Sequence, residues 1–239
     1  MEFTACTNAG RHRSINEDSY LVDRESGIYI VADGMGGHKA GEVASALACK
    51  TFRASFDDHI DRGDKGKIAQ MLKEAVLNAN EAIVEKATGR SEYSGMGTTL
   101  TAAFLDRMTL YLTHVGDSRA YLVRNGEMTQ LTEDHTLVNE MVRRGEVSPD
   151  AIQMHPLRHV ITKALGTYPA IDADLTTQEL VPGDRVILCT DGLTSMLADT
   201  DILNAIQQAD DIENACGSLI DAANSRGGED NITIVLIGV

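Results

Sequence analysis

The sequence predicts an α+β fold in which antiparallel sheets pack against helices as a layered sandwich. The first observation is that strand and helix patterns do not alternate regularly, as they would in a doubly wound parallel sheet. The second is a run of consecutive strand patterns in the middle of the chain, over residues 98–131. The third is that long amphipathic helix patterns precede this run, and a helix and a strand pattern end the chain. Together these features favour sheets made of neighbouring strands, with helices covering them.

The N-terminal third contains short strands followed by two helices. Strands are predicted over residues 3–7, 20–22 and 28–32, and the last of these, IYIVA, is β-branched and closed by Asp33-Gly34. Apolar residues then recur at helical spacing, first from Val43 to Phe52 and then from Ile68 to Ile83. These two stretches predict amphipathic helices.

The rest of the chain is rich in strands and ends in a buried one. Predicted strands over 98–104, 108–115 and 119–123 are followed by Asn125-Gly126, a strong hairpin signal that leads into a strand over 128–131. Residues 136–166 are charged and irregular, which predicts an inserted lobe. Later strands are expected over 173–180, 186–190 and 232–239, with a helix capped by Asp199 and another from Ile212 to Ala223. We find no linker or repeat, so we expect a single domain over residues 1–239.

Composition and charge narrow the possible partners. The chain has 239 residues and a formal net charge of −15, from 36 acidic and 21 basic residues, so it would repel a nucleic acid backbone. It has no run of about 20 apolar residues and no signal-peptide core, so no membrane partner is expected. Its cysteines are scattered without a CxxC pair, which predicts reduced thiols, no zinc site and a cytoplasmic location; they are Cys6, Cys49, Cys189 and Cys216.

Four aspartates lie beside apolar strand patterns. Asp33 follows YIVA, Asp117 follows LTHVG, Asp191 follows ILCT, and Asp230 precedes NITIVLI. Strand ends hold side chains with little freedom, and carboxylates are hard oxygen ligands suited to Mg²⁺ or Mn²⁺. Asp-Gly pairs are also common in turns, so each of these aspartates taken alone is more often a turn residue than a ligand.

The segment from Asp33 to Glu42, DGMGGHKAGE, is glycine-rich and directly precedes a helix pattern. Glycines let the backbone approach a ligand closely, so its amides or a carbonyl could meet an ion. The chain contains no Walker loop, HExxH, GxSxG or dinucleotide GxGxxG pattern, which argues against those classes of enzyme.

Seven short motifs occur in the order seen in one enzyme family. They are RSINED (13–18), VADGMGGHKAGE (31–42), GMGTTL (95–100), VGDSRAYL (115–122), LTEDHTLV (131–138), LCTDGLT (188–194) and GGEDNIT (227–233). With them the chain resembles the metal-dependent protein phosphatases of the 2C type (PPM), and the compact bacterial members most closely. The resemblance runs from about residue 4 to the C-terminus. It implies a four-layer α/β/β/α sandwich of two antiparallel sheets flanked by helices, with a flap over residues 136–166.

The resemblance also implies a set of metal ligands. Asp33 would bridge two ions, and the carbonyl of Gly34 would complete the shell of the first. Asp191 and Asp230 would bind the second ion, and Asp117, together with Asp191, would hold a third. The resemblance therefore implies two or three Mn²⁺ or Mg²⁺ ions as cofactors.

Further roles follow from the resemblance for residues around the metals. Glu17 and Asp18 would orient metal-bound waters, and Arg13 would grip the substrate phosphate with its planar fork of donors. Many eukaryotic relatives carry a histidine directly after the Asp-Gly pair, where this chain has Met35. The nearest titratable group that could protonate the leaving oxygen is then His38, and a metal-bound water is the alternative.

The implied function is hydrolysis of phosphoserine and phosphothreonine in proteins by direct attack of a water or hydroxide that bridges two divalent metals. Phosphorylated proteins made by serine/threonine kinases would be the partners of a monomeric enzyme that acts in signalling. Two other classes stay open. A phosphoprotein-binding regulatory module that has lost turnover should lack a metal aspartate. A metal-dependent phosphodiesterase is disfavoured by the acidic charge and the scarce aromatic residues.

Overall fold

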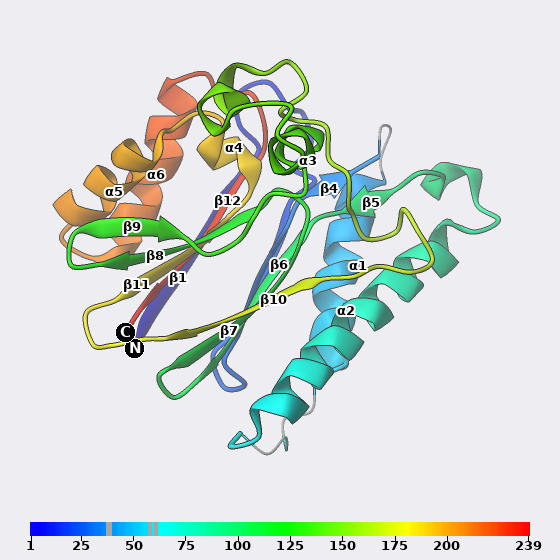
Figure 1. Cartoon of the computed structure of the whole chain (residues 1–239), viewed down its shortest axis with the longest axis horizontal. Helices are drawn as coiled ribbons and strands as arrows, with labels where there is room; N and C mark the ends of the chain where they lie inside the picture. The colour runs from blue at the N-terminus through cyan, green and yellow to red at the C-terminus, as the bar shows by residue number, and fades with distance from the viewer. Residues whose placement is uncertain (37–39, 57–58, 60–61) are drawn as a thin grey trace.

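Two antiparallel five-stranded sheets lie face to face in the computed structural model, which describes residues 1–36, 40–56, 59 and 62–239 (Figure 1). We call the sheets A and B. Sheet A contains, in spatial order, β1 (Glu2–Asn8), β12 (Ile232–Gly238), β11 (Arg185–Cys189), β8 (Arg119–Arg124) and β9 (Glu127–Gln130). Sheet B contains β10 (Asp174–Glu179), β7 (Thr109–Val115), β6 (Leu100–Asp106), β3 (Ile28–Ala32) and β2 (Ser19–Asp23). A two-stranded ribbon pairs β4 (Gly34–Met35) with β5 (Gly97–Thr98).

Helices cover the outer face of each sheet. On sheet B lie α1 (Gly41–Ala54) and α2 (Lys65–Ala87), and on sheet A lie α5 (Asp199–Gln208) and α6 (Ile212–Ser225). The short helix α4 (Asp191–Thr194) follows β11, and the one-turn helix η1 (Ser91–Tyr93) precedes β5. The four layers confirm the predicted sandwich. No helix in the described residues is long and apolar enough to span a membrane.

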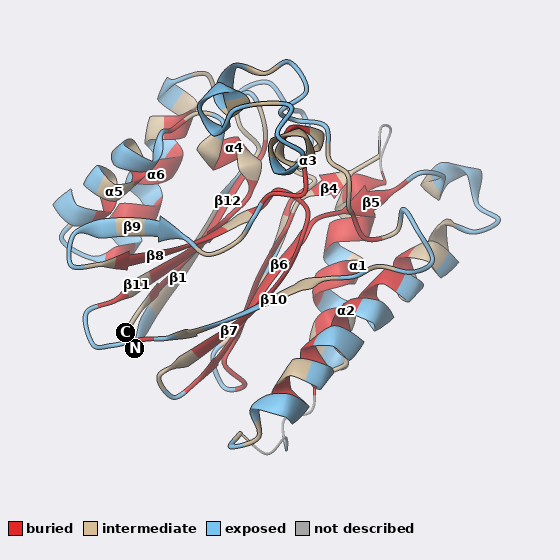
Figure 2. Cartoon of the chain, in the orientation of Figure 1, coloured by how far each residue is buried: buried red, intermediate tan, exposed pale blue. Residues whose placement is uncertain are grey.

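The core explains why the central strands are apolar on both faces. In β3, Ile28, Ile30 and Ala32 pack toward α1 and α2, while Tyr29 and Val31 face the other sheet. This period of two is what a strand requires when each of its faces contacts a different layer. In Figure 2 the buried residues are concentrated in the central strands and on the inner sides of the helices, whereas the edge strands β9 and β10 contain no buried residue.

Two predicted details of secondary structure were wrong. The strand expected over 98–104 is broken at Thr99, because the Thr99 amide donates a hydrogen bond to the carbonyl of Asp33 at 2.9 Å instead of joining the sheet ladder. Asp199 is not the cap of α5: the N-cap residue is Ala198, and its amide is bonded by the carboxylate of Asp201 at 3.2 Å. An acidic side chain therefore stabilises this helix start from inside the first turn.

The region predicted as a flap lies between β9 and β10. It contains α3 (Leu137–Arg143) and the 3₁₀ helix η2 (Pro149–Met154), joined by turns. Its two ends are held together, since Thr136 and Ile161 form an isolated antiparallel bridge and the Leu137 amide donates to the carbonyl of Val160 at 2.8 Å. Most side chains from Arg143 to Val160 are exposed, as expected for an insertion outside the core.

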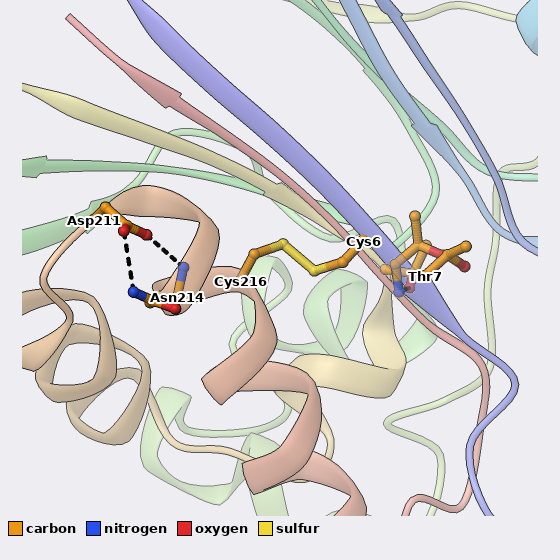
Figure 3. The surroundings of a disulfide bond; sticks show 7 residues. Cys6, Thr7, Asp211, Asn214 and Cys216 are labelled. Atoms are coloured by element: carbon orange, nitrogen blue, oxygen red, sulfur yellow. Dashed lines mark hydrogen bonds between the residues drawn. A yellow bond between two sulfur atoms is a disulfide. The ribbon is translucent and has the colours of Figure 1, made fainter.

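A disulfide bond joins Cys6 in β1 to Cys216 in α6, across a sequence separation of 210 residues (Figure 3). The prediction of reduced thiols was therefore wrong for this pair, while Cys49 and Cys189 are free and buried. The alternation of side chains in β1 places Cys6 between sheet A and α6, and the helical spacing of α6 places Cys216 there as well. Neither pattern alone shows that the two sulfur atoms are bonded. At its start, α6 is capped by Asp211, whose carboxylate accepts a hydrogen bond from the Asn214 amide at 2.7 Å.

Candidate functional site

The four strand-end aspartates reach a single cavity at one end of the sandwich. The cavity has a volume of about 630 Å³ and contains the predicted residues Arg13, Glu17, Asp33, Gly34, Asp117, Asp191 and Asp230 in its lining. Asp33 and Asp117 follow strands of sheet B, whereas Asp191 follows and Asp230 precedes strands of sheet A. Carboxylates that are far apart in sequence thus converge where the two sheets meet.

On sheet A, close main-chain packing brings Asp191 and Asp230 together. A Cβ atom added to Gly192 would lie 2.0 Å from the carbonyl oxygen of Asn231, so only glycine fits there. This close packing of Gly192 on Asn231 brings the residues that precede them, Asp191 and Asp230, to the same cavity. The Asp230 carboxylate also accepts a hydrogen bond from the Asn231 amide at 2.8 Å.

On sheet B, hydroxyl groups fix the position of Asp33. The Asp33 amide donates to the Thr99 hydroxyl at 2.9 Å, and the Thr98 hydroxyl donates to the Asp33 carbonyl at 2.8 Å. The next residue, Gly34, is confined by two other segments, because a Cβ there would lie 2.2 Å from the Gly41 carbonyl and 2.4 Å from the Glu17 carbonyl. The predicted ligand pair Asp33-Gly34 is thus rigidly positioned.

Asp117 occupies a turn between β7 and β8. Gly116 precedes it at φ +111°, and a Cβ there would lie 2.5 Å from the side chain of Thr99. Ser118 follows it, and the hydroxyls of Ser118 and Thr99 are 2.7 Å apart. One residue, Thr99, therefore contacts both aspartate-bearing turns of sheet B.

Burial and mutual repulsion raise the pKa values of these carboxyls. For Asp33, loss of hydration is the main cause and holds the pKa well above its usual range, with repulsion from Asp18, Asp191, Asp117 and Asp230 adding to it. Burial likewise raises the pKa of Asp117, and repulsion from Asp191 raises it further. Burial also raises the pKa of Asp191, and repulsion from Asp230 adds to this effect. Burial also raises the pKa of Asp18 to about 7. Without a cation, the cavity concentrates more negative charge than it can stabilise.

The donor set fits divalent metal ions. The oxygen atoms are hard ligands, and two of them, Oδ1 of Asp18 and Oδ1 of Asp117, are buried without a hydrogen-bond partner in the described part of the chain. Among the same residues, no three His, Cys, Asp or Glu side chains are already gathered in the arrangement of a metal site, so the carboxylates would have to close around an ion when it binds. Mg²⁺ keeps several water ligands in protein sites, so water molecules would complete the shell of each ion.

The predicted substrate-binding residues also line the cavity. Nη2 of Arg13 lies 2.8 Å from Oδ2 of Asp230, and half of the Arg13 side chain is exposed at the cavity mouth. The amide of Glu17 donates to the Asn231 side chain at 2.8 Å, which brings Glu17 to the cavity wall. His38, predicted as a proton donor, lies outside the described residues.

Sequence reasoning missed several residues of this site. Asn231 binds three backbone groups, since its side chain donates to the carbonyls of Ala9 and Ile15 and accepts from the Glu17 amide. Thr190 donates to Asp18 at 2.9 Å. His159 of the flap lines the cavity. Burial and repulsion from Asp230 raise the pKa of Asp191, and attraction to His159 lowers it in part. The signal for Asn231 was its place in the GGEDNIT motif, and the signal for His159 was its place in the flap that the resemblance implies over residues 136–166.

Comparisons with known proteins agree with this geometry. The family description "Protein phosphatase 2C" matches residues 7–223. The serine/threonine phosphatase stp of Listeria welshimeri is 37% identical over 234 residues, which cover 97% of this chain and 93% of that protein. The crystal structure of the serine/threonine phosphatase PstP/Ppp of Mycobacterium tuberculosis superposes with a TM-score of 0.90 at 38% identity, covering 98% of this chain and 97% of that one. The catalytic domain of PstP in complex with two manganese ions gives a TM-score of 0.86 at 37% identity, covering 98% and 96%.

Proposed function

The chain belongs to the protein phosphatase 2C family and is a metal-dependent protein serine/threonine phosphatase, and we propose that the carboxylates lining its cavity hold the metal ions. Asp33 and the carbonyl of Gly34 would hold one ion, and Asp33, Asp191 and Asp230 a second. Asp117, with Asp191, would hold a third. Mn²⁺ or Mg²⁺ suits this set of oxygen donors.

When bound, the divalent ions supply a water of lowered pKa as the nucleophile and offset negative charge on the phosphoryl oxygens. The residues of the chain provide position. Glu17, which lines the cavity, would accept hydrogen bonds from waters there, and Asp18, which is buried and lies outside the lining, would help to orient them. The Asp18 carboxyl suits this role because Oδ2 is held by Thr190, whereas Oδ1 has no partner among the described residues.

Arg13 would bind the substrate phosphate. Its guanidinium lies at the cavity mouth and is half exposed, so a phosphoserine or phosphothreonine can reach it. The group has five N–H donors, and one can remain on Asp230 while others bind phosphoryl oxygens. The proton required by the leaving oxygen we assign to His38, on sequence grounds alone.

One observation carries this proposal: three carboxyls whose pKa values are raised chiefly by loss of hydration, Asp33, Asp117 and Asp191, line the same cavity. A protein does not concentrate acidic groups away from water without a partner for their charge. Divalent cations are the partners that also serve phosphate hydrolysis.

The test is a calorimetric Mn²⁺ titration combined with phosphate release from a phosphothreonine peptide. We expect the wild-type chain to bind at least two ions and to release phosphate only when Mn²⁺ is present. We expect Asp191→Asn to lose ions and turnover together. Binding of Mn²⁺ without phosphate release would favour the non-catalytic module, and Asp191→Asn with unchanged stoichiometry would remove Asp191 from the site.

The setting of the activity belongs to the same proposal. We propose a single catalytic domain over residues 1–239, monomeric, acting on phosphoproteins made by serine/threonine kinases in the cytoplasm. Kinases make phosphoproteins where ATP is present, and this supports a location in the cytoplasm. The Cys6–Cys216 disulfide points the other way, because disulfide bonds persist mainly in oxidising compartments. Trapping thiols with an alkylating reagent during lysis measures which state the cell maintains, and a fully oxidised pair would contradict the cytoplasmic location.

A further inference from the structure

The carboxylate of Asp117 is positioned by its backbone rather than by side-chain partners. Oδ1 of Asp117 is buried and has no hydrogen-bond partner in the described part of the chain. Its direction in the cavity therefore depends on the turn formed by Gly116, Asp117 and Ser118. Whatever holds the two flanking residues also holds the carboxylate.

His135 holds the Gly116 side of this turn with two hydrogen bonds. The Gly116 amide donates to Nδ1 of His135 at 3.0 Å, and the His135 amide donates to the Gly116 carbonyl at 2.7 Å. Both residues are buried, so neither bond is exchanged with water. Because Nδ1 accepts, the proton of the neutral ring lies on Nε2, which faces Oδ2 of Asp174 at 3.4 Å.

The Ser118 side of the turn is held by a second buried histidine through Thr101. The Thr101 hydroxyl donates to the Ser118 carbonyl at 3.0 Å, so it accepts from Nδ1 of His114 at 2.9 Å. The rings of His114 and His135 stack with their centroids 5.0 Å apart. The two histidines thus brace the two sides of the Asp117 turn and support each other.

His135 also anchors the flap. The Thr162 amide, where the flap returns to the core, donates to the carbonyl of His135 at 2.8 Å. The neighbouring residue Thr136 forms the bridge with Ile161 that closes the flap. The same short segment therefore contacts the Asp117 turn on one side and the base of the flap on the other.

We propose that His135 is a positioning residue that sets the Asp117 carboxylate for metal binding and keeps the base of the flap in register with it. This inference rests on the proposed role of Asp117 as a ligand of the third ion. It predicts that the acceptor atom at Nδ1, rather than the imidazole as such, is what the site requires.

Three substitutions of His135 test whether the site requires the hydrogen-bond acceptor at Nδ1 or the imidazole ring itself. His135→Asn retains an acceptor oxygen near the place of Nδ1, His135→Leu removes it at similar size, and His135→Gln moves the polar group toward Asp174. In a Mn²⁺ titration we expect Leu and Gln to weaken the Asp117-dependent ion roughly tenfold or more, a typical effect of losing a residue that orients a metal ligand, while the other ions bind as before. Asn should stay within about threefold of the wild type.

Amide hydrogen exchange supplies a readout that does not involve metal or turnover. The Gly116 and Thr162 amides should exchange faster in His135→Leu than in His135→Asn, and distant core amides should be unaffected. In the Asp117→Asn background, His135→Leu should have no further effect on Mn²⁺ binding, since it acts through Asp117.

The outcomes distinguish this inference from the proposed function. If Asp117→Asn alone leaves Mn²⁺ binding unchanged, Asp117 is not a ligand and the proposed third site fails. If Asp117→Asn removes an ion but His135→Leu and His135→Asn weaken it equally, or weaken every ion equally, the positioning role is wrong. Should the Leu variant fail to fold, the Asn and Gln pair gives the same decision.

Discussion

The two sheets hold their aspartates by different means. On sheet A, Asp191 and Asp230 are brought together by close main-chain packing, since a Cβ atom added to Gly192 would lie only 2.0 Å from the carbonyl oxygen of Asn231. On sheet B, Asp33 and Asp117 are placed by buried hydroxyl groups, and the Thr99 side chain contacts both turns. A main-chain contact tolerates no added atom, whereas a hydroxyl network can be altered one bond at a time. The sheet A pair should therefore respond to substitution abruptly and the sheet B pair by degrees.

The largest expected effect is the loss of activity on substitution of Asp191, which follows β11, compared with Asp117, which follows β7. Asp191→Asn should reduce turnover of a phosphothreonine peptide by more than about 100-fold, because losing even a residue that supports a ligand costs 10–100-fold. Asp117→Asn should cost one ion and leave the other two. Steady-state kinetics and Mn²⁺ stoichiometry measure both, with exposed Asp210→Asn as the charge control. Equal stoichiometry in the two variants would contradict the assignment of Asp191 to two ions.

The hydroxyl network of sheet B is tested by Thr99→Val. This change keeps the shape of a fully buried side chain but leaves the Asp33 amide and the Ser118 hydroxyl without their partner. Each unsatisfied group costs about 1–3 kcal/mol, so the free energy of unfolding should fall by about 3 kcal/mol. Thr99→Ser should recover most of it. Urea unfolding monitored by circular dichroism measures the difference, and equal loss in Ser and Val would show that packing, not hydrogen bonding, dominates.

Removing metal should destabilise the whole chain, because the clustered carboxylates then repel each other. At a free Mn²⁺ concentration 100 times the dissociation constant, one site adds about 2.7 kcal/mol to the free energy of unfolding. Thermal unfolding with Mn²⁺ and with a chelator measures this term. Asp117→Asn should keep most of the stabilisation and Asp191→Asn should lose most of it; the reverse order would assign the dominant ion to sheet B.

A smaller effect concerns pH and the buried His114. Burial is the main cause that lowers the pKa of His114 to about 3, from 6.5, with repulsion from His135 adding to it. The folded state therefore binds fewer protons than the unfolded state between these values. Its stability is fully present above pH 6.5 and is lost as the pH falls toward 3.

At pH 5 the loss should be about 2 kcal/mol relative to pH 7. His114→Asn cannot titrate there, so its stability profile should lack this slope. The carboxyls with raised pKa values act in the opposite direction, and subtracting the profile of the variant from that of the wild type removes their contribution. Parallel profiles would mean that His114 is not held neutral.

The sequence predicted most strands and helices because local patterns determine them. The alternation in IYIVA and the apolar spacing from Ile68 to Ile83 are set by short stretches, and the structure agrees with both. Local patterns could not foresee features that depend on distant backbone. The break at Thr99 arises from the carbonyl of Asp33, which lies 66 residues earlier.

The same division applies to the site. The aspartates were found because strand-end position and motif order are visible in the chain. Asn231 and Thr190 escaped because their roles consist of bonds to residues far away in sequence. Polar residues whose partners are remote look, in sequence, like ordinary turn or surface residues.

The bond between Cys6 and Cys216 turns nearly the entire chain into a covalent ring. A protease that cuts the exposed stretch near Met154 would leave two pieces that still migrate together until a reductant is added. Closing so large a ring also limits how far the unfolded chain can spread, a contribution of about 2–5 kcal/mol to stability. An oxidised molecule can thus survive a nick that would release half of a reduced one.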